Sequence, residues 1–254
     1  KDFYQYTTGG WQKNHPLKPE YARFGSFDVL NENNEKRLND LFKSMTEMHA
    51  ASGSVEQKIS DIYKMGLDSV KLNEEGFAPV KKYLDQILAA DSKEGLVKLI
   101  AELHDNGESP FFGTFVMSDL MDSDSQILYV GQGGLGIGDR DYYTEPENAE
   151  IKKGYMMFLS RIFDLAGMPE PEIAAANALA VEDTLAHYSW TSVQERDMEK
   201  LYNPMSSEEL EARYPGFGFK EYFAARNIPA QEKLIVNEPS FFEGFSRYFA
   251  DADL

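Results

Sequence analysis

Hydrophobic residues recur every three or four positions along most of the chain, a spacing that places them on one face of an α-helix. Between residues 32 and 50, Leu38, Leu41, Met45 and Met48 follow this pattern. Similar spacing predicts further helices. They cover residues 55 to about 73, 77–88, 92–106, 155–166, 173–188, 210–214 and 241–249.

Capping signals support these assignments. A serine followed three residues later by Glu or Gln is typical of the first turn of a helix. The last predicted helix is aromatic on most of its inward positions, and we expect that face to need protein beyond residue 254. The serine pairs are Ser54 with Gln57, Ser206 with Glu209 and Ser240 with Glu243.

The pattern changes in one region. Residues 111–117 and 126–130 are rich in β-branched and aromatic side chains, and residues 118–125 between them are polar and acidic. This predicts a short antiparallel hairpin with a polar turn. We see no internal repeat and no linker. The expected fold class is therefore mainly α, a multi-helix domain with one small antiparallel β-hairpin at about residues 111–130.

Composition narrows the possible partners. The formal charge of −18 comes from 43 acidic against 25 basic residues. This charge argues against nucleic acid and against an anionic membrane surface, since both require a basic footprint. The chain has no cysteine, which excludes disulfides and thiolate chemistry. No apolar run reaches the roughly 18 residues of a membrane span.

Two motifs suggest chemistry that their surroundings do not support. Residues 131–136 match the dinucleotide fingerprint G-x-G-x-x-G, but the residues that follow do not predict the helix a pyrophosphate needs, so we interpret the segment as a loop. None of the histidines is spaced as the i, i+4 pair of a helical zinc protease, and we interpret each as a surface or capping residue. No self-sufficient catalytic constellation emerges. The histidines are His15, His49, His104 and His187.

Arg23 and Arg140 are the notable charged residues. Arg23 lies among aromatic and glycine residues, where a fixed guanidinium can bind a carboxylate through two hydrogen bonds. The alternative is an internal salt bridge to Asp28 or Asp2. For Arg140, flanked by two aspartates, we favour a structural role in tying its loop.

Four segments, in order, resemble the neprilysin family of zinc metallopeptidases, which includes the endothelin-converting enzymes and their bacterial relatives. The first, DFYQYTTGGW, is too particular for a generic helix. Thr8 stands where vertebrate members carry a cysteine, which points to a bacterial-type member. The four segments are residues 2–11 (DFYQYTTGGW), 23–30 (RFGSFDVL), 134–143 (GLGIGDRDYY) and 195–205 (ERDMEKLYNPM).

The resemblance implies a role for the chain. Residues 1–254 would be part of one helical lobe that covers the substrate, and the zinc-bearing catalytic lobe would follow it and be absent here. Zinc would belong to the full-length enzyme, with none bound by this chain, and the partners would be short peptides and the missing lobe. Arg23 would bind the C-terminal carboxylate of a peptide, without the second arginine that Asn31 replaces. A periplasmic or otherwise extracytoplasmic location is expected.

Two other classes of function remain open. The chain could be a helical ligand-binding protein without catalysis, such as a bacterial surface glycan binder that uses an exposed Trp190. It could also be a scaffold for a protein partner, if the aromatic face of residues 241–249 proves exposed.

Overall fold

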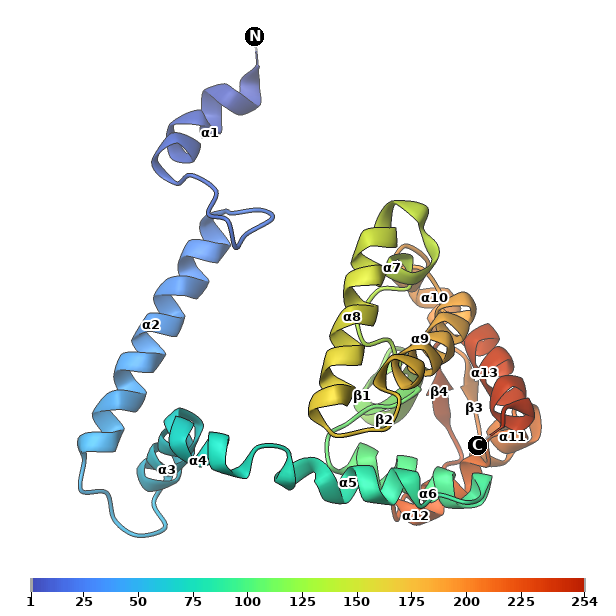
Figure 1. Cartoon of the computed structure of the whole chain (residues 1–254). Coiled ribbons are helices and arrows are strands. Elements are labelled where there is room, and N and C mark those ends of the chain that lie inside the picture. The colour runs from blue at the N-terminus through green and yellow to red at the C-terminus, as the bar shows by residue number, and fades with distance from the viewer. Residues whose placement is uncertain (1, 254) are drawn as a thin grey trace. The chain divides into compact units, whose positions relative to one another are not determined.

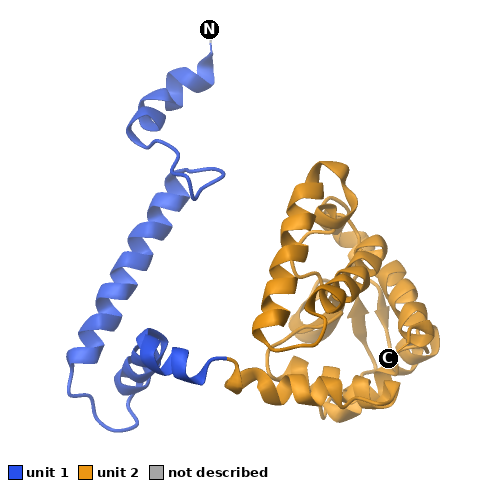
Figure 2. Ribbon diagram, viewed as in Figure 1, with its two compact units in different colours: residues 1–76 blue, residues 77–254 orange. Residues whose placement is uncertain are grey.

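The computed structural model describes residues 2–253 and forms two compact units, Lys1–Gly76 and Phe77–Leu254 (Figure 2). Helices dominate both units, and a small sheet accompanies them in the second, which confirms the predicted fold class. That both units belong to one lobe stays a prediction.

Within its described residues unit 1 consists of helices and connecting loops, without a strand (Figure 1). The helix α2 packs against α3, where the rings of Phe42 and Tyr63 lie 5.8 Å apart and the Tyr63 hydroxyl donates to Asn39 Oδ1 at 2.7 Å. The helices are α1 (Phe3–Asn14), α2 (Ser26–Glu47), α3 (Val55–Leu67) and α4 (Ser69–Glu75).

The segment DFYQYTTGGW lies in α1 with its cap. Asp2 accepts from the amide of Gln5 at the start of the helix, and Tyr6 is 85% exposed. One prediction in unit 1 was wrong. The single helix expected over residues 55–73 is interrupted at Asp68, whose side chain accepts from the amide of Lys71 and starts a new helix.

Unit 1 buries little of its apolar surface. Among its described residues only Ser60 is fully buried. The apolar stripes of its amphipathic helices therefore have few partners within the unit, although such stripes normally contact other protein. The most exposed apolar residues are Phe3, Tyr4, Tyr6, Phe27, Leu30, Val55, Ile62, Met65, Leu67 and Val70.

Unit 2 contains the core. Its helices surround a small sheet (Figure 1). The elements are α5 (Ala78–Leu88), α6 (Lys93–Asp105), β1 (Phe112–Asp119), β2 (Asp122–Gln132), α7 (Asp141–Thr144), η1 (Pro146–Asn148), α8 (Ala149–Leu165), α9 (Pro171–Tyr188), η2 (Gln194–Arg196), α10 (Met198–Leu201), β3 (Pro204–Met205), α11 (Ser207–Arg213), α12 (Phe219–Ala225), β4 (Leu234–Val236) and α13 (Pro239–Asp251).

The sheet has the strand order β1-β2-β4-β3. The strands β1 and β2 form the predicted antiparallel hairpin, with Thr114 opposite Val130. The strands extend into the segment predicted to be a polar turn, where Asp119 lies opposite Asp122 after a shift in register, so only residues 120 and 121 connect the strands. The strand β4 adds to β2 in parallel, with Tyr129 opposite Ile235, and β3 pairs antiparallel with β4.

Phe112 lies at the centre of the core and is completely buried. The aromatic side chains of α13 reach it: Phe242 and Phe245 lie within 6 Å, measured between ring centroids. These side chains and Phe241 are fully buried inside unit 2. The expectation that this face needs protein beyond residue 254 was therefore wrong, because α12, the strands and the 217–219 segment already cover it.

The capping signals had mixed outcomes. Ser206 and Glu209 form the predicted reciprocal box at α11. The last helix, however, begins at Pro239, and the Ser240 hydroxyl instead accepts a hydrogen bond from the indole N–H of Trp190 at 2.7 Å. A proline at the first helical position fits this start, since it has no amide to satisfy.

Candidate functional site

Arg23 lies in the loop between α1 and α2, and its side chain is exposed. Aromatic rings hold the loop on either side of it: Tyr21 and Phe24 meet edge to face at 5.0 Å, and Trp11 lies 6.2 Å from Phe24. The Tyr21 hydroxyl also donates to Glu32 of α2 at 3.0 Å. The expected aromatic surroundings are present, and they fix the backbone while leaving the guanidinium free to meet a ligand.

The salt bridges considered for Arg23 do not form. Asp2 caps α1, and the Asp28 carboxylate accepts from the amide of Gly25 at 2.7 Å. No ion pair involves Arg23 among the described residues. The neighbouring position Asn31 donates to Glu35 on the surface of α2. Arg23 is therefore an exposed cation that a carboxylate could reach, and Asn31 supplies no second positive charge.

The glycine-rich loop after β2 is held in place by specific contacts. Gly134 has a φ of +79°, which favours glycine. Arg140 donates to the carbonyl of Ser189 at 3.0 Å and so ties the loop to the end of α9, as predicted. A one-turn helix, α7, does follow, contrary to our expectation, but it starts at residue 141, five residues after the last glycine of the motif. The motif lacks the geometry of a dinucleotide site.

A cluster around Glu182 stabilises the same loop. The carboxylate accepts from the amide of Gly136 at 3.1 Å, from the Tyr155 hydroxyl at 2.8 Å and from the Tyr143 hydroxyl. Burial and the hydrogen bond to Glu182 raise the pKa of both tyrosines. The ammonium group of Lys152 donates to the carboxylate of Asp183, the residue that follows Glu182 in α9. No pattern in the sequence predicts this cluster, since its members are far apart along the chain.

Two carboxylates flank Gln132 at the end of β2. The backbone amide of Gln132 donates to the Glu238 carboxylate at 2.8 Å. The side-chain amide of Gln132 donates to the Glu195 carboxylate at 2.6 Å. Burial raises the pKa of Glu238 to about 7, and the nearby Glu195 adds to the rise. Burial also raises the pKa of Glu195. Glu195 lines a polar cavity of about 350 Å³, together with Gln132, Asp139 and Arg140. Sequence reasoning missed Glu238 because no local pattern marks a buried carboxylate.

The histidines do not gather at one site. His15 stacks on Trp11 at 4.2 Å, and His49 and His187 are exposed. His104 differs from the predicted surface role, because it is half-buried against Phe112 and contacts the Tyr222 hydroxyl. Burial lowers its pKa.

Within residues 2–253 no three His, Cys, Asp or Glu side chains converge as a metal site would require. A structural or catalytic zinc needs at least three protein ligands. The described residues therefore do not fit a zinc ion.

Trp190 is not the exposed platform that a glycan binder would use. It is half-buried, its backbone amide donates to Gln132 at 2.6 Å, and its indole is bonded to Ser240. A stacked sugar needs a free aromatic face. The phenylalanines of α13 are buried, so the condition for the scaffold hypothesis is not met.

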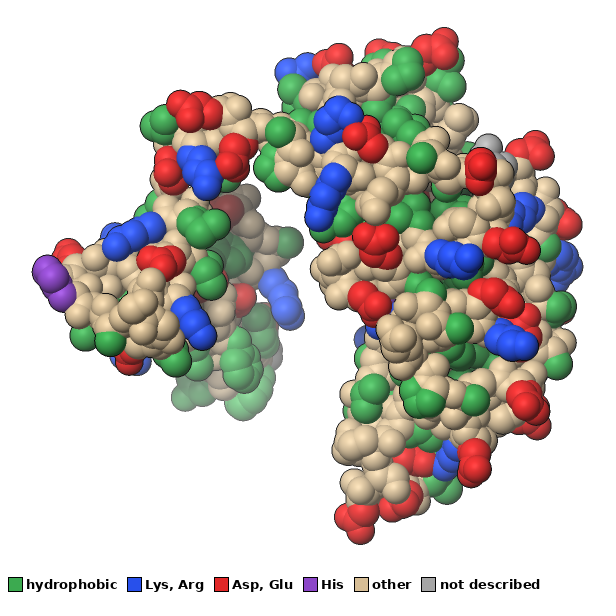
Figure 3. All heavy atoms as spheres, turned by 90° about the horizontal axis from the view of Figure 1, so that it is seen from below, with side chains coloured by type: hydrophobic (Ala, Val, Ile, Leu, Met, Phe, Trp, Pro, Cys, Tyr) green, Lys and Arg blue, Asp and Glu red, His purple; other side chains and the backbone are tan. Residues whose placement is uncertain are grey.

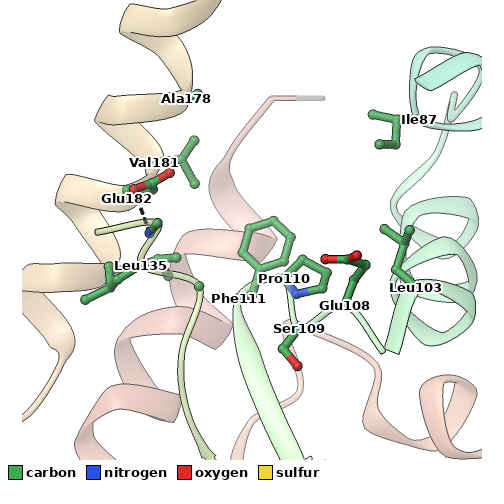
Figure 4. A pocket seen from close by; sticks show the side chains of 13 residues that line it. Ile87, Leu103, Glu108, Ser109, Pro110, Phe111, Leu135, Ala178, Val181 and Glu182 are labelled. Atoms are coloured by element: carbon green, nitrogen blue, oxygen red, sulfur yellow. Dashed lines mark hydrogen bonds between the residues drawn. The ribbon is translucent and has the colours of Figure 1, made fainter. Parts of the chain in front are cut away.

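An apolar pocket of about 800 Å³ lies in unit 2 between α9, the end of α6 and the loop at residues 134–136 (Figure 4). It combines apolar walls with Glu108 and Glu182. Elsewhere acidic and basic side chains alternate over the face seen in Figure 3 without forming one large patch. Among the described helices none is both long and apolar enough to cross a membrane.

Comparison with known proteins gives consistent matches over the whole chain. The sequence profile described as peptidase family M13, N-terminal part, matches residues 1–254. Human endothelin-converting enzyme 1 is 25% identical over 268 residues, which cover 99% of this chain and 34% of that protein. The chain thus spans about a third of the length of this relative.

Solved structures of similar proteins match the same region of the chain. The crystal structure of the Mycobacterium tuberculosis zinc metalloprotease Zmp1 with an inhibitor matches with a TM-score of 0.90 and 26% identity, over 99% of this chain and 39% of that chain. PepO of Lactobacillus rhamnosus shares the fold, with a TM-score of 0.78 and 19% identity, over 98% of this chain and 41% of that chain.

Proposed function

The chain belongs to peptidase family M13, and from this premise we propose that it is the N-terminal part of a zinc metalloendopeptidase that cleaves oligopeptides. The match over residues 1–254 carries the proposal. The proteins it resembles include a zinc metalloprotease and an endothelin-converting enzyme, and each is more than twice as long as this chain.

In this proposal the chain contributes substrate access, and the rest of the enzyme contributes the zinc ion and the chemistry. Zinc supplies a Lewis acid and an activated water in such enzymes. The described residues lack a ligand set for it. The exposed apolar side chains of unit 1 support contact with the catalytic part, because a surface of this kind is normally covered by other protein.

Substrates would be short peptides, admitted to a closed chamber that excludes folded proteins. Arg23 would bind the terminal carboxylate of the peptide, which its exposure and its rigid loop support. By analogy with its relatives the enzyme would work outside the cytoplasm. The glycan-binding alternative has no observation in its favour, since Trp190 is already hydrogen-bonded within unit 2.

Peptide cleavage by the full-length protein, with and without a zinc chelator, tests the proposal. We expect cleavage of peptides of about ten residues that chelation abolishes and added zinc restores. The rate should fall steeply as the peptide lengthens. Zinc-dependent cleavage by residues 1–254 alone would contradict the assignment of the chemistry to the remainder of the enzyme.

A further inference from the structure

The pocket in unit 2, which we name the α9 pocket, has an apolar interior. Side chains from α5, α6 and α9 converge on it, together with the start of the hairpin and the glycine-rich loop (Figure 4). The cavity has a volume of about 800 Å³ and is open to water. Covering its apolar walls with another apolar group would be favourable, because it removes them from water. Its main apolar residues are Ile87, Leu103, Phe111, Leu135, Val181 and Leu185.

The floor of the α9 pocket is rigid. Phe111 has a φ of +67°, an unusual conformation for a bulky residue. Its ring packs against Phe245 at 5.7 Å and Phe249 at 6.2 Å, both on α13. The pocket is therefore a preformed shape and not a gap that its own side chains could close.

The last described residues lie beside this pocket. A smaller cavity of about 100 Å³ shares Phe111 and Val181 with it, and Ala252 and Asp253 form part of the wall of that cavity. A polypeptide that continues from Asp253 would start at the edge of the α9 pocket and could enter it without a long connection.

The polar groups define what can bind. Glu182 already accepts three hydrogen bonds, from Gly136, Tyr143 and Tyr155, which hold it against the glycine-rich loop. The side chain of Glu108 is exposed and takes part in no hydrogen bond or ion pair within the described residues, although its backbone amide donates to Leu103. The pocket thus fits apolar side chains with one cation at the edge. It lacks the several convergent polar groups that orient a small-molecule ligand.

We propose that the α9 pocket is the docking site for the segment that follows Asp253 in the full-length protein, with apolar side chains in the pocket and a basic residue facing Glu108. The inference rests on the proposed function, in which this chain is part of a longer enzyme. The relatives extend well beyond the matched region, since it covers 34% of human endothelin-converting enzyme 1 and 39% of the Zmp1 chain.

Cysteine labelling of the full-length protein tests the proposal, because residues 1–254 contain no cysteine. In a background without cysteines beyond residue 254, Ile87→Cys probes the pocket, and Ile87 is 44% exposed in this structure. Lys81→Cys, on the same helix and outside the pocket, is the matched control, with a 62% exposed side chain.

We expect a maleimide to react with Ile87→Cys at least about tenfold more slowly than with Lys81→Cys in the native protein, and at the same rate after denaturation. Equal rates in the native protein would overturn the proposal. So would protection that appears only with added peptide substrate or only at high protein concentration, since these would identify a substrate or a second copy as the occupant.

A photo-cross-linking residue at Leu135 identifies the occupant directly. Cross-links within one polypeptide to residues beyond 254 support the proposal, and cross-links to a second copy or to substrate peptide refute it. Peptide cleavage by the unlabelled variants is measured separately. An active enzyme whose pocket is open would refute only this inference, whereas a covered pocket in a protein without zinc-dependent cleavage would refute only the proposed function.

Discussion

The backbone of Phe111 lies so close to Gly134 that a Cβ atom on the glycine would stand 2.6 Å from the Cα of Phe111. Both residues have positive φ angles, +67° and +79°. The hairpin and the glycine-rich loop therefore approach each other at a point that only a glycine permits. This contact fixes the floor of the α9 pocket.

Gly134→Ala should accordingly destabilise the protein strongly. The left-handed φ costs about 1 kcal/mol for alanine, and the backbone clash adds about 1–3 kcal/mol. Chemical denaturation measures the change in the free energy of unfolding. Gly138→Ala is the matched control, since Gly138 has a φ of +87° with no atom within 4 Å of the added Cβ, and should cost only about 1 kcal/mol. Equal losses in the two variants would show that the contact with Phe111 does not matter.

The sequence predicted helices best where periodicity and capping agree. For α6, the cap at Ser92, the apolar spacing and the stop at Asn106 all point to the same element, and the observed helix is Lys93–Asp105. The hairpin was also found, although its polar tip was taken for a turn. In this segment Asp119 pairs with Asp122 and Ser118 with Gln126, so β2 begins at residue 122, while the side chains of residues 122–126 stay exposed.

The features that escaped prediction depend on distant contacts. The strand β4 has only the residues Leu234–Val236 and exists through its pairing with β2, about a hundred positions earlier. The burial of Glu238 and the half-buried His104 likewise arise only when separate segments pack together. A pattern within a short window cannot show them.

Glu238→Gln should remove a pH dependence of stability. Burial raises the pKa of Glu238 from 4.5 to about 7 in the folded protein. The folded state therefore binds the proton more tightly than the unfolded state, so the stability is greatest below pH 4.5 and declines as the pH rises toward about 7. The loss amounts to at most about 3 kcal/mol.

Unfolding free energies measured from pH 4 to pH 8 check this prediction. Glu238→Gln keeps an acceptor for the amide of Gln132 and should lack the decline. Glu243→Gln, on the exposed side of α13, the helix that follows Glu238, should keep the original profile. An unchanged decline in Glu238→Gln would assign the pH dependence to another group.

His104 should act in the opposite direction. Burial lowers its pKa below 6.5, and Arg226 adds to this effect. The unfolded state then binds the proton more tightly, so stability is present above pH 6.5 and is lost as the pH falls through the lowered folded pKa. His104→Asn keeps an acceptor for Tyr222 and should be less sensitive to acid than the original protein, while the exposed His187→Gln should not differ. Greater acid sensitivity of His104→Asn would contradict this role.

Arg23→Met in the full-length enzyme tests the proposed carboxylate contact. A guanidinium–carboxylate pair is worth about 1.5–3 kcal/mol, so its loss should weaken the preference for free-acid over amidated peptides by about 10- to 100-fold. The effect should appear in kcat/KM for free-acid peptides and leave amidated peptides nearly unchanged.

Arg37→Met is the matched control for Arg23→Met, because Arg37 is also an exposed arginine of unit 1, on α2. It removes the same charge and should preserve the preference. If both variants lose it equally, the effect comes from the overall charge of the enzyme and not from a contact. If Arg23→Met retains the full preference, the terminal carboxylate is bound elsewhere, and the guanidinium of Arg23 is an exposed surface group without a role in substrate binding.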